Sequence, residues 1–131
     1  METTKVNKEH IDVLHFEHEK WVNQLNFYKD ELKTYNNRLE DIAVRFNGRG
    51  VMAELEMFQN KFIRKNEVID ILIHDINEHE GILANSVKEN PVASDHRLFT
   101  DHSGLRDRME TFLKIYNELK PNFMRYLTKY M

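Results

Sequence analysis

Apolar residues recur along this chain at alternating steps of three and four positions, the spacing of a helical seam. Three such stripes cover residues 14–46, 51–83 and 98–130. Glycine and proline are scarce within the stripes, and no stretch shows the strict alternation of a half-buried strand. The pattern therefore predicts an all-α fold built from three long helices.

The breaks between the stripes set the expected helix boundaries. We expect helices at about 8–46, 51–89 and 95–130, together forming a single domain over residues 1–131. Gly48 and Gly50 lie between the first two helices, where a left-handed cap and a tight reversal are expected. The second helix is expected to end before a proline, because the residue before proline disfavours helical backbone angles.

The spacing of the stripes also predicts how the helices face one another. In an antiparallel pair, facing residues have numbers with a constant sum. The register that places Phe46 opposite Val51 also places His18 opposite His79, and the same rule places His79 opposite His102. The sequence therefore predicts an antiparallel, coiled-coil-like bundle with three histidines in one layer of its core.

Three imidazoles in one core layer suggest a metal site. Each neutral ring carries one donor and one acceptor, so three rings around an axis satisfy one another only partly. A cation could accept three lone pairs at once, and three imidazoles with an open position are a known zinc arrangement. We expect a divalent transition metal at His18, His79 and His102, with water, Glu80 or His15 completing the coordination. Zinc is the first candidate, and copper, nickel and iron are alternatives.

Other functions remain open at this point. The histidines could instead form a polar or pH-responsive core cluster in a structural or protein-interaction rod. If a bound metal held water, the ion could lower the water's pKa and support hydrolysis, so the sequence leaves enzymatic activity undecided. Cysteine is absent, which excludes thiolate ligands and disulfides.

Two short motifs resemble parts of hemerythrin-like di-iron bundles. His102 with Asp107 forms an H-x4-D pair, and His15 with Glu19 forms an H-x3-E pair. The H-x3-H motif of that family is absent, so the chain is assigned to no family. A di-iron site that adds His15, Glu19 and Asp107 to the three histidines is a minor alternative.

The distribution of charge bears on partners and location. The formal net charge is −3, which gives no reason to expect nucleic-acid binding. Lys and Arg exceed Asp and Glu in residues 33–65 and 116–131, whereas the remainder is acidic and holds all seven histidines. No apolar run approaches the roughly 20 residues of a membrane span, and the polar N-terminus does not resemble a signal peptide. We therefore expect a cytoplasmic protein that does not associate with membranes.

Several apolar residues fall outside the seam. Ile63, Ile71 and Ile73 lie beside the second stripe, and Leu113 lies beside the third. A three-helix core is too narrow to bury them all, so either the flanks widen the core or the surface meets another chain. We expect a homodimer that associates through the second helix, with a different protein partner as the alternative.

Overall fold

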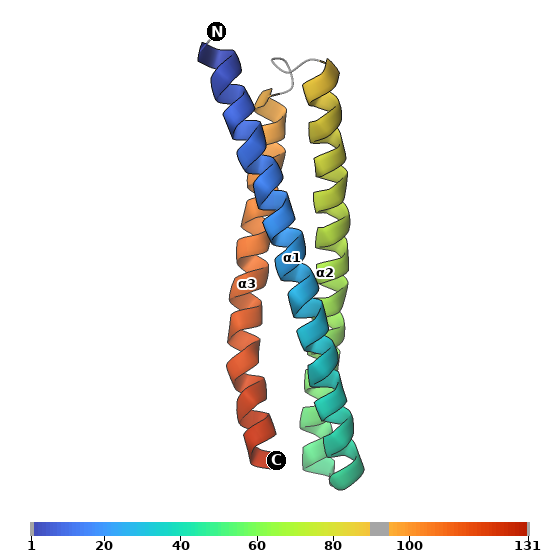
Figure 1. The fold of residues 1–131 in the computed structure, drawn as a ribbon. Helices are drawn as coiled ribbons and strands as arrows, with labels where there is room; N and C mark the ends of the chain where they lie inside the picture. The colour runs from blue at the N-terminus through green and yellow to red at the C-terminus, as the bar shows by residue number, and fades with distance from the viewer. Residues whose placement is uncertain (1, 90–94, 131) are drawn as a thin grey trace.

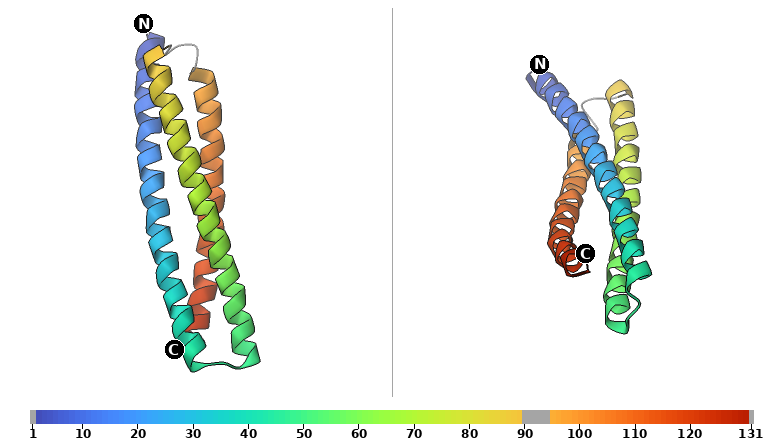
Figure 2. Two further views of the ribbon diagram at one scale, coloured as in Figure 1. Left: turned by 90° about the vertical axis from the view of Figure 1, so that its right-hand side faces the viewer. Right: turned by 60° about the horizontal axis from the view of Figure 1, so that its bottom comes forward.

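Three long helices make up the part of the chain that the structure, a computed structural model, describes: the backbone of residues 2–89 and 95–130 and the side chains of residues 11–85 and 97–130. The helices are α1 (Glu2–Arg45), α2 (Arg49–Glu89) and α3 (Asp95–Tyr130). They pack lengthwise with alternating direction, so that the start of α1 lies at the same end as the end of α2 and the start of α3 (Figures 1 and 2). The predicted all-α bundle of three helices is confirmed.

The reversal between α1 and α2 differs from the prediction. The backbone N–H of Phe46 still donates to the carbonyl of Ile42, and that of Met52 donates to the carbonyl of Gly48 at 3.0 Å. α2 therefore begins earlier than expected and includes Gly50. None of the described glycines has a positive φ, so the predicted left-handed cap is wrong. The second predicted connection, at residues 90–94, lies outside the described residues.

The core follows the predicted layers. The ring centroids of Phe58 and Phe123 lie 5.3 Å apart, and those of Phe46 and Tyr130 lie 5.6 Å apart. Both pairs fall in the layers that the constant-sum rule defines. α3 also continues through Pro121 to Tyr130, as its uninterrupted stripe predicts. The register inferred from the sequence is therefore confirmed along the bundle.

The three core histidines lie between two apolar clusters. Leu14, Leu83 and Leu98 form a small buried cluster toward the end of the bundle that holds the N-terminus. On the other side of the histidines, the main core begins with Trp21 and continues to Tyr126. The polar layer is therefore enclosed by apolar side chains above and below, and only the spaces between helices connect it to the surface.

The apolar residues outside the seam divide into two groups. Ile73 and Leu113 are partly buried and pack against the main core, which they widen. Ile63 and Ile71 remain more than half exposed, at 52% and 55%. Within the described residues, none of the helices contains a segment long and apolar enough to cross a membrane.

Candidate metal centre

One buried histidine from each helix meets at a common point. His18 of α1, His79 of α2 and His102 of α3 are 3%, 5% and 1% exposed. Nε2 of His18 lies 3.0 Å from Nδ1 of His79 and 3.2 Å from Nδ1 of His102. The structure thus brings together the three histidines that the sequence places in one layer. We call these three residues the histidine layer.

Carboxylates hold the outer nitrogens of two of these rings. Nδ1 of His18 lies 3.2 Å from Oε1 of Glu80, and Nε2 of His102 lies 3.2 Å from Oε1 of Glu17. An ionised carboxylate only accepts hydrogen bonds, so each of these ring nitrogens carries the hydrogen. In a neutral imidazole the other nitrogen then carries a lone pair. The lone pairs of His18 Nε2 and His102 Nδ1 therefore face each other across 3.2 Å, an arrangement that a shared cation or proton would stabilise.

The third ring has no such carboxylate contact. Nδ1 of His79 faces Nε2 of His18, and Nε2 of His79 is buried with no hydrogen-bond partner. The backbone of Leu98 and the carboxylate of Asp101 both favour the charged form of this ring, although neither completes a hydrogen bond to Nε2. His79 can donate from Nδ1 to His18, or present the Nδ1 lone pair to a cation while Nε2 keeps the hydrogen.

The spacing of the three nitrogens suits a small transition-metal ion. Nitrogens bound to zinc at about 2.0–2.1 Å in tetrahedral geometry lie roughly 3.3–3.4 Å apart. The separations of His18 Nε2 from Nδ1 of His79 and of His102, 3.0 and 3.2 Å, are slightly shorter than this. One nitrogen from each ring lies within 4.8 Å of the others. The two pairs that include His18 thus lie within a few tenths of an ångström of the spacing of zinc ligands.

Burial keeps the rings available as ligands. Loss of solvation lowers the pKa of His102 to about 4, although the hydrogen bond to Glu17 acts in the opposite sense. Burial also lowers the pKa of His79, and the neighbouring His18 adds to this effect. Both His79 and His102 are therefore neutral at pH 7, the form that binds metals. Trp21, the only tryptophan, stacks on the His102 ring with centroids 4.8 Å apart.

Glu80 and His15, the two residues expected to complete the coordination, face each other outside the triangle of ring nitrogens. Nδ1 of His15 lies 2.6 Å from Oε1 of Glu80, and its Nε2 lies 3.2 Å from Glu19. The hydrogen bond to Glu80 raises the pKa of the exposed His15. Glu80 thus bridges His15 and the outer nitrogen of His18. In this arrangement both residues orient the His18 ring, and neither points at the centre of the layer.

Arg106 is a residue of the site that sequence reasoning missed. It donates hydrogen bonds to Glu17, which also contacts His102. Although burial raises the pKa of Glu17, the hydrogen bonds from Arg106 and His102 hold it below its ordinary value. The available signal was the spacing of Arg106 four residues after His102, which places both on one face of α3.

The remaining candidates lie away from the histidine layer. Asp107 is exposed on α3, and His74 is exposed on α2. Glu19 contacts His15 at the surface. The structure therefore does not bring the two hemerythrin-like motifs together around the three histidines. The side chains of His10 and His96 lie outside the described residues.

Comparisons with known proteins add no constraint on function. No protein-family model, curated protein or solved structure matches the chain. The function must therefore be argued from the chemistry of the site.

Proposed function

We propose that this protein binds a divalent transition-metal ion, with zinc as the first candidate, through His18, His79 and His102. The observation that carries the proposal is that Glu80 and Glu17 contact the outer nitrogens of His18 and His102, so that the lone pairs of the two inner nitrogens face each other. A cation between the rings would replace the repulsion between these lone pairs with coordination. Metal-bound histidines characteristically donate their other N–H to a carboxylate or carbonyl, which is the arrangement found around His18 and His102.

We propose binding or sensing of the metal as the primary function, and catalysis only as a secondary one. Glu80 and Glu17 already bond to rings of the layer, so neither is free to act as a general base in this arrangement. A fourth ligand position occupied by water would support metal-assisted hydrolysis, because the ion would lower the water's pKa. Hydrolysis is therefore the secondary form of the same proposal.

Equilibrium titration tests the proposal. Metal-depleted protein is titrated with zinc against a chromophoric chelator, and with copper or nickel while the fluorescence of Trp21 is followed. We expect one tightly bound ion per chain, with quenching by copper or nickel because Trp21 stacks on His102. His18→Ala and His102→Ala should abolish both signals. The matched control is His74→Ala, which removes an exposed histidine and should leave affinity unchanged.

A different result would support the second candidate function. If the wild type binds no stoichiometric metal, the histidine layer is a polar core cluster in a structural or interaction rod. Two observations favour this alternative: His79 can donate directly to His18 without an ion, and burial lowers the pKa of His102. Such a layer would respond to acid and would show no dependence on added metal.

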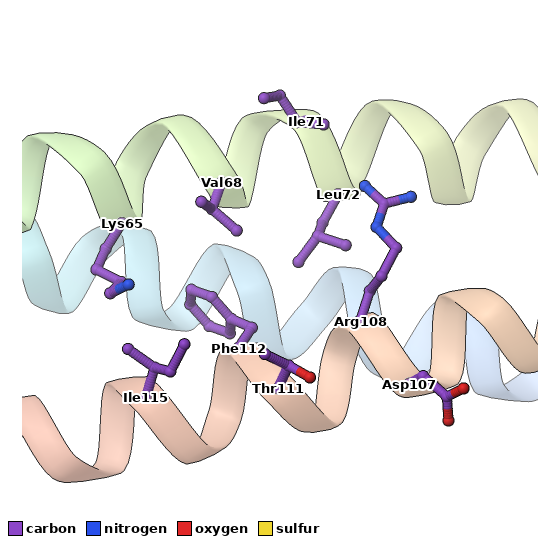
Figure 3. Close-up of a pocket in the computed structure, with 9 residues that line it drawn as sticks. All are labelled: Lys65, Val68, Ile71, Leu72, Asp107, Arg108, Thr111, Phe112 and Ile115. Atoms are coloured by element: carbon purple, nitrogen blue, oxygen red, sulfur yellow. The ribbon is translucent and has the colours of Figure 1, made fainter.

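We also propose that two copies associate through the face formed by α2 and α3. A groove of about 480 Å³ runs along this face and is lined mainly by Val68, Leu72, Phe112 and Ile115, with Ile71 at its rim. Figure 3 shows Val68 and Leu72 of α2 pointing toward α3 and Phe112 of α3 pointing toward α2, whereas Ile71 points away from α3. We call it the apolar groove. It lies near the middle of the bundle, so an antiparallel pair would place the basic end of one copy beside the acidic end of the other.

A further inference from the structure

We infer that the metal ion enters and leaves the histidine layer between α2 and α3, with His74 and Glu78 as transient ligands at the entrance. This inference rests on the proposed metal binding and adds the route that the ion takes. Three potential ligands that the metal centre does not use form a cluster on the surface of α2. A cavity joins this cluster to His79.

The cavity, which we call the α2/α3 hollow, has a volume of about 370 Å³. His79 lines it, together with Asp75, Glu78, Asp101 and Gly104. The buried Nε2 of His79 has no hydrogen-bond partner. A Cβ atom added at Gly104 would meet no other atom within 4 Å. The hollow is therefore large enough for a hydrated ion. In the tautomer whose Nδ1 donates to His18, Nε2 of His79 carries a lone pair that can meet an incoming ion at the inner end of the hollow.

The outer nitrogens of the other two rings are covered. Glu80 contacts the outer nitrogen of His18 and is itself bonded to His15. Glu17 contacts the outer nitrogen of His102 and is held by Arg106. An ion that approached past either ring would have to break hydrogen bonds to a charged group, which are the stronger kind. Approach past His79 breaks no hydrogen bond to the outer nitrogen of the ring, because Nε2 has no partner.

Potential ligands also lie at the entrance of the α2/α3 hollow. His74, Asp75 and Glu78 each offer one ligand atom, and these atoms lie within 4.8 Å of one another. The side chains of His74 and Glu78 are 75% and 63% exposed, so they can meet an ion from solvent. Asp75 is held by Arg108 at 2.8 Å. Because Asp75 and Glu78 also line the hollow, the ligands form a series from the surface to His79.

Rates of metal binding test this route separately from affinity. A transient site on the path changes entry and exit equally, so it alters both rates and leaves the dissociation constant unchanged. We propose stopped-flow mixing of metal-depleted full-length protein with nickel, followed by Trp21 fluorescence, and chelator-driven release of nickel from the loaded protein. His18→Ala supplies the background from ions bound elsewhere.

Three variants should change the rates in defined directions. Glu78→Gln removes a ligand and a negative charge, so entry and exit should both slow by roughly three- to tenfold. Gly104→Leu fills the hollow and should slow both rates similarly. Arg108→Gln frees Asp75 and removes a positive charge, so both rates should rise by a similar factor. All three should keep the wild-type dissociation constant.

The control uses the opposite side of the layer. Glu19 lines a second hollow, between α1 and α2, that reaches His18 and has a volume of about 350 Å³. Glu19→Gln should leave both rates unchanged. The inference is overturned if Glu19→Gln slows binding while Glu78→Gln and Gly104→Leu do not, because entry would then lie past His18. Lack of equilibrium binding by the wild type would instead overturn the proposed function.

Discussion

At the residue scale, burial determines the charge of the histidine layer and therefore how the metal-free protein responds to acid. The folded-state pKa of His102 is about 4, below the ordinary value of 6.5 that applies when the chain unfolds. Between these values the unfolded chain binds more protons than the folded one. The free energy of unfolding should therefore be greatest above about pH 6.5 and should fall as the pH drops toward 4.

Urea denaturation of metal-free protein at a series of pH values checks this prediction. We expect the free energy of unfolding to fall by on the order of 1–3 kcal/mol between pH 7 and 4, and protonation of His102 to contribute to this loss. His102→Leu cannot titrate and should show a clearly shallower pH dependence, whereas the exposed His74→Ala should follow the wild type. Equal slopes in the wild type and His102→Leu would show that burial of this ring does not govern acid stability.

A hydrogen bond from the buried Tyr116 to a partly buried carboxylate supports a second prediction at this scale. Tyr116, which is 1% exposed, donates to Oε1 of Glu31 at 2.6 Å, whereas Tyr126 donates to the backbone carbonyl of Val51 at 3.2 Å. Hydrogen bonds to charged groups contribute about 1.5–3 kcal/mol and neutral ones about 0.5–1.5 kcal/mol. Tyr116→Phe should therefore lower the free energy of unfolding more than Tyr126→Phe, as measured by urea denaturation. The reverse order would refute this ranking.

The same scale shows where prediction from sequence reached its limit. The register identified the three histidines, because layer membership depends only on residue spacing. It did not identify Arg106, and it left the role of Glu80 open. Those features depend on side-chain rotamers and on which ring nitrogen points outward, and neither is encoded in the heptad-like spacing.

At the element scale, helix lengths and register were predictable, whereas the reversal between α1 and α2 was not. Long uninterrupted stripes specify helices, because each added helical turn places another apolar side chain of the stripe in the core. The segment around Gly48 has two candidate glycines and no apolar periodicity, so its sequence is compatible with more than one turn. The structure uses Gly48 as an acceptor for the first turn of α2. The type of turn could therefore be determined only from the backbone conformation, not from the sequence.

Gly81, an exposed glycine within α2, carries the element-scale prediction. An added Cβ would contact no atom within 4 Å, so alanine fits without displacing a neighbour. Alanine also has a higher helix propensity and restricts the unfolded chain. We expect Gly81→Ala to raise the free energy of unfolding by about 0.5–1 kcal/mol, measured by urea denaturation, with metal affinity unchanged. Destabilisation would indicate that this position needs the conformational freedom of glycine.

At the scale of the whole molecule, the apolar groove provides a test of self-association. Ile71 lines the groove and is 55% exposed, so Ile71→Glu can disrupt a dimer without disturbing the core. Ile73 is a poorer choice, because it packs against the core and its replacement would also destabilise the monomer. We expect sedimentation to report a dimer for the wild type and a larger monomer fraction for Ile71→Glu. Val44→Glu, at an exposed site on α1, is the control, and a wild-type monomer at high micromolar concentration would exclude the dimer.

Metal binding and folding should be linked across the whole molecule, because the three ligands come from three different helices. An ion that binds only the folded chain stabilises it by about 2.7 kcal/mol when free metal is about 100 times the dissociation constant. Zinc should therefore raise the melting temperature at pH 7.5. Protons compete with zinc only below the folded-state pKa of a ligand, and that of His102 is about 4.

The zinc-dependent increase in melting temperature should consequently persist at pH 6, where the metal-free protein has already begun to lose stability, and should disappear as the pH approaches 4. Calorimetry with and without zinc at pH 7.5, 6 and 4 would separate these two pH dependences. His102→Leu should show no increase at any of the three pH values, because one ligand is missing and the other two rings come from α1 and α2 alone. If zinc raised the melting temperature of His102→Leu as much as that of the wild type, the ion would be binding away from the histidine layer, and α3 would play no part in holding it.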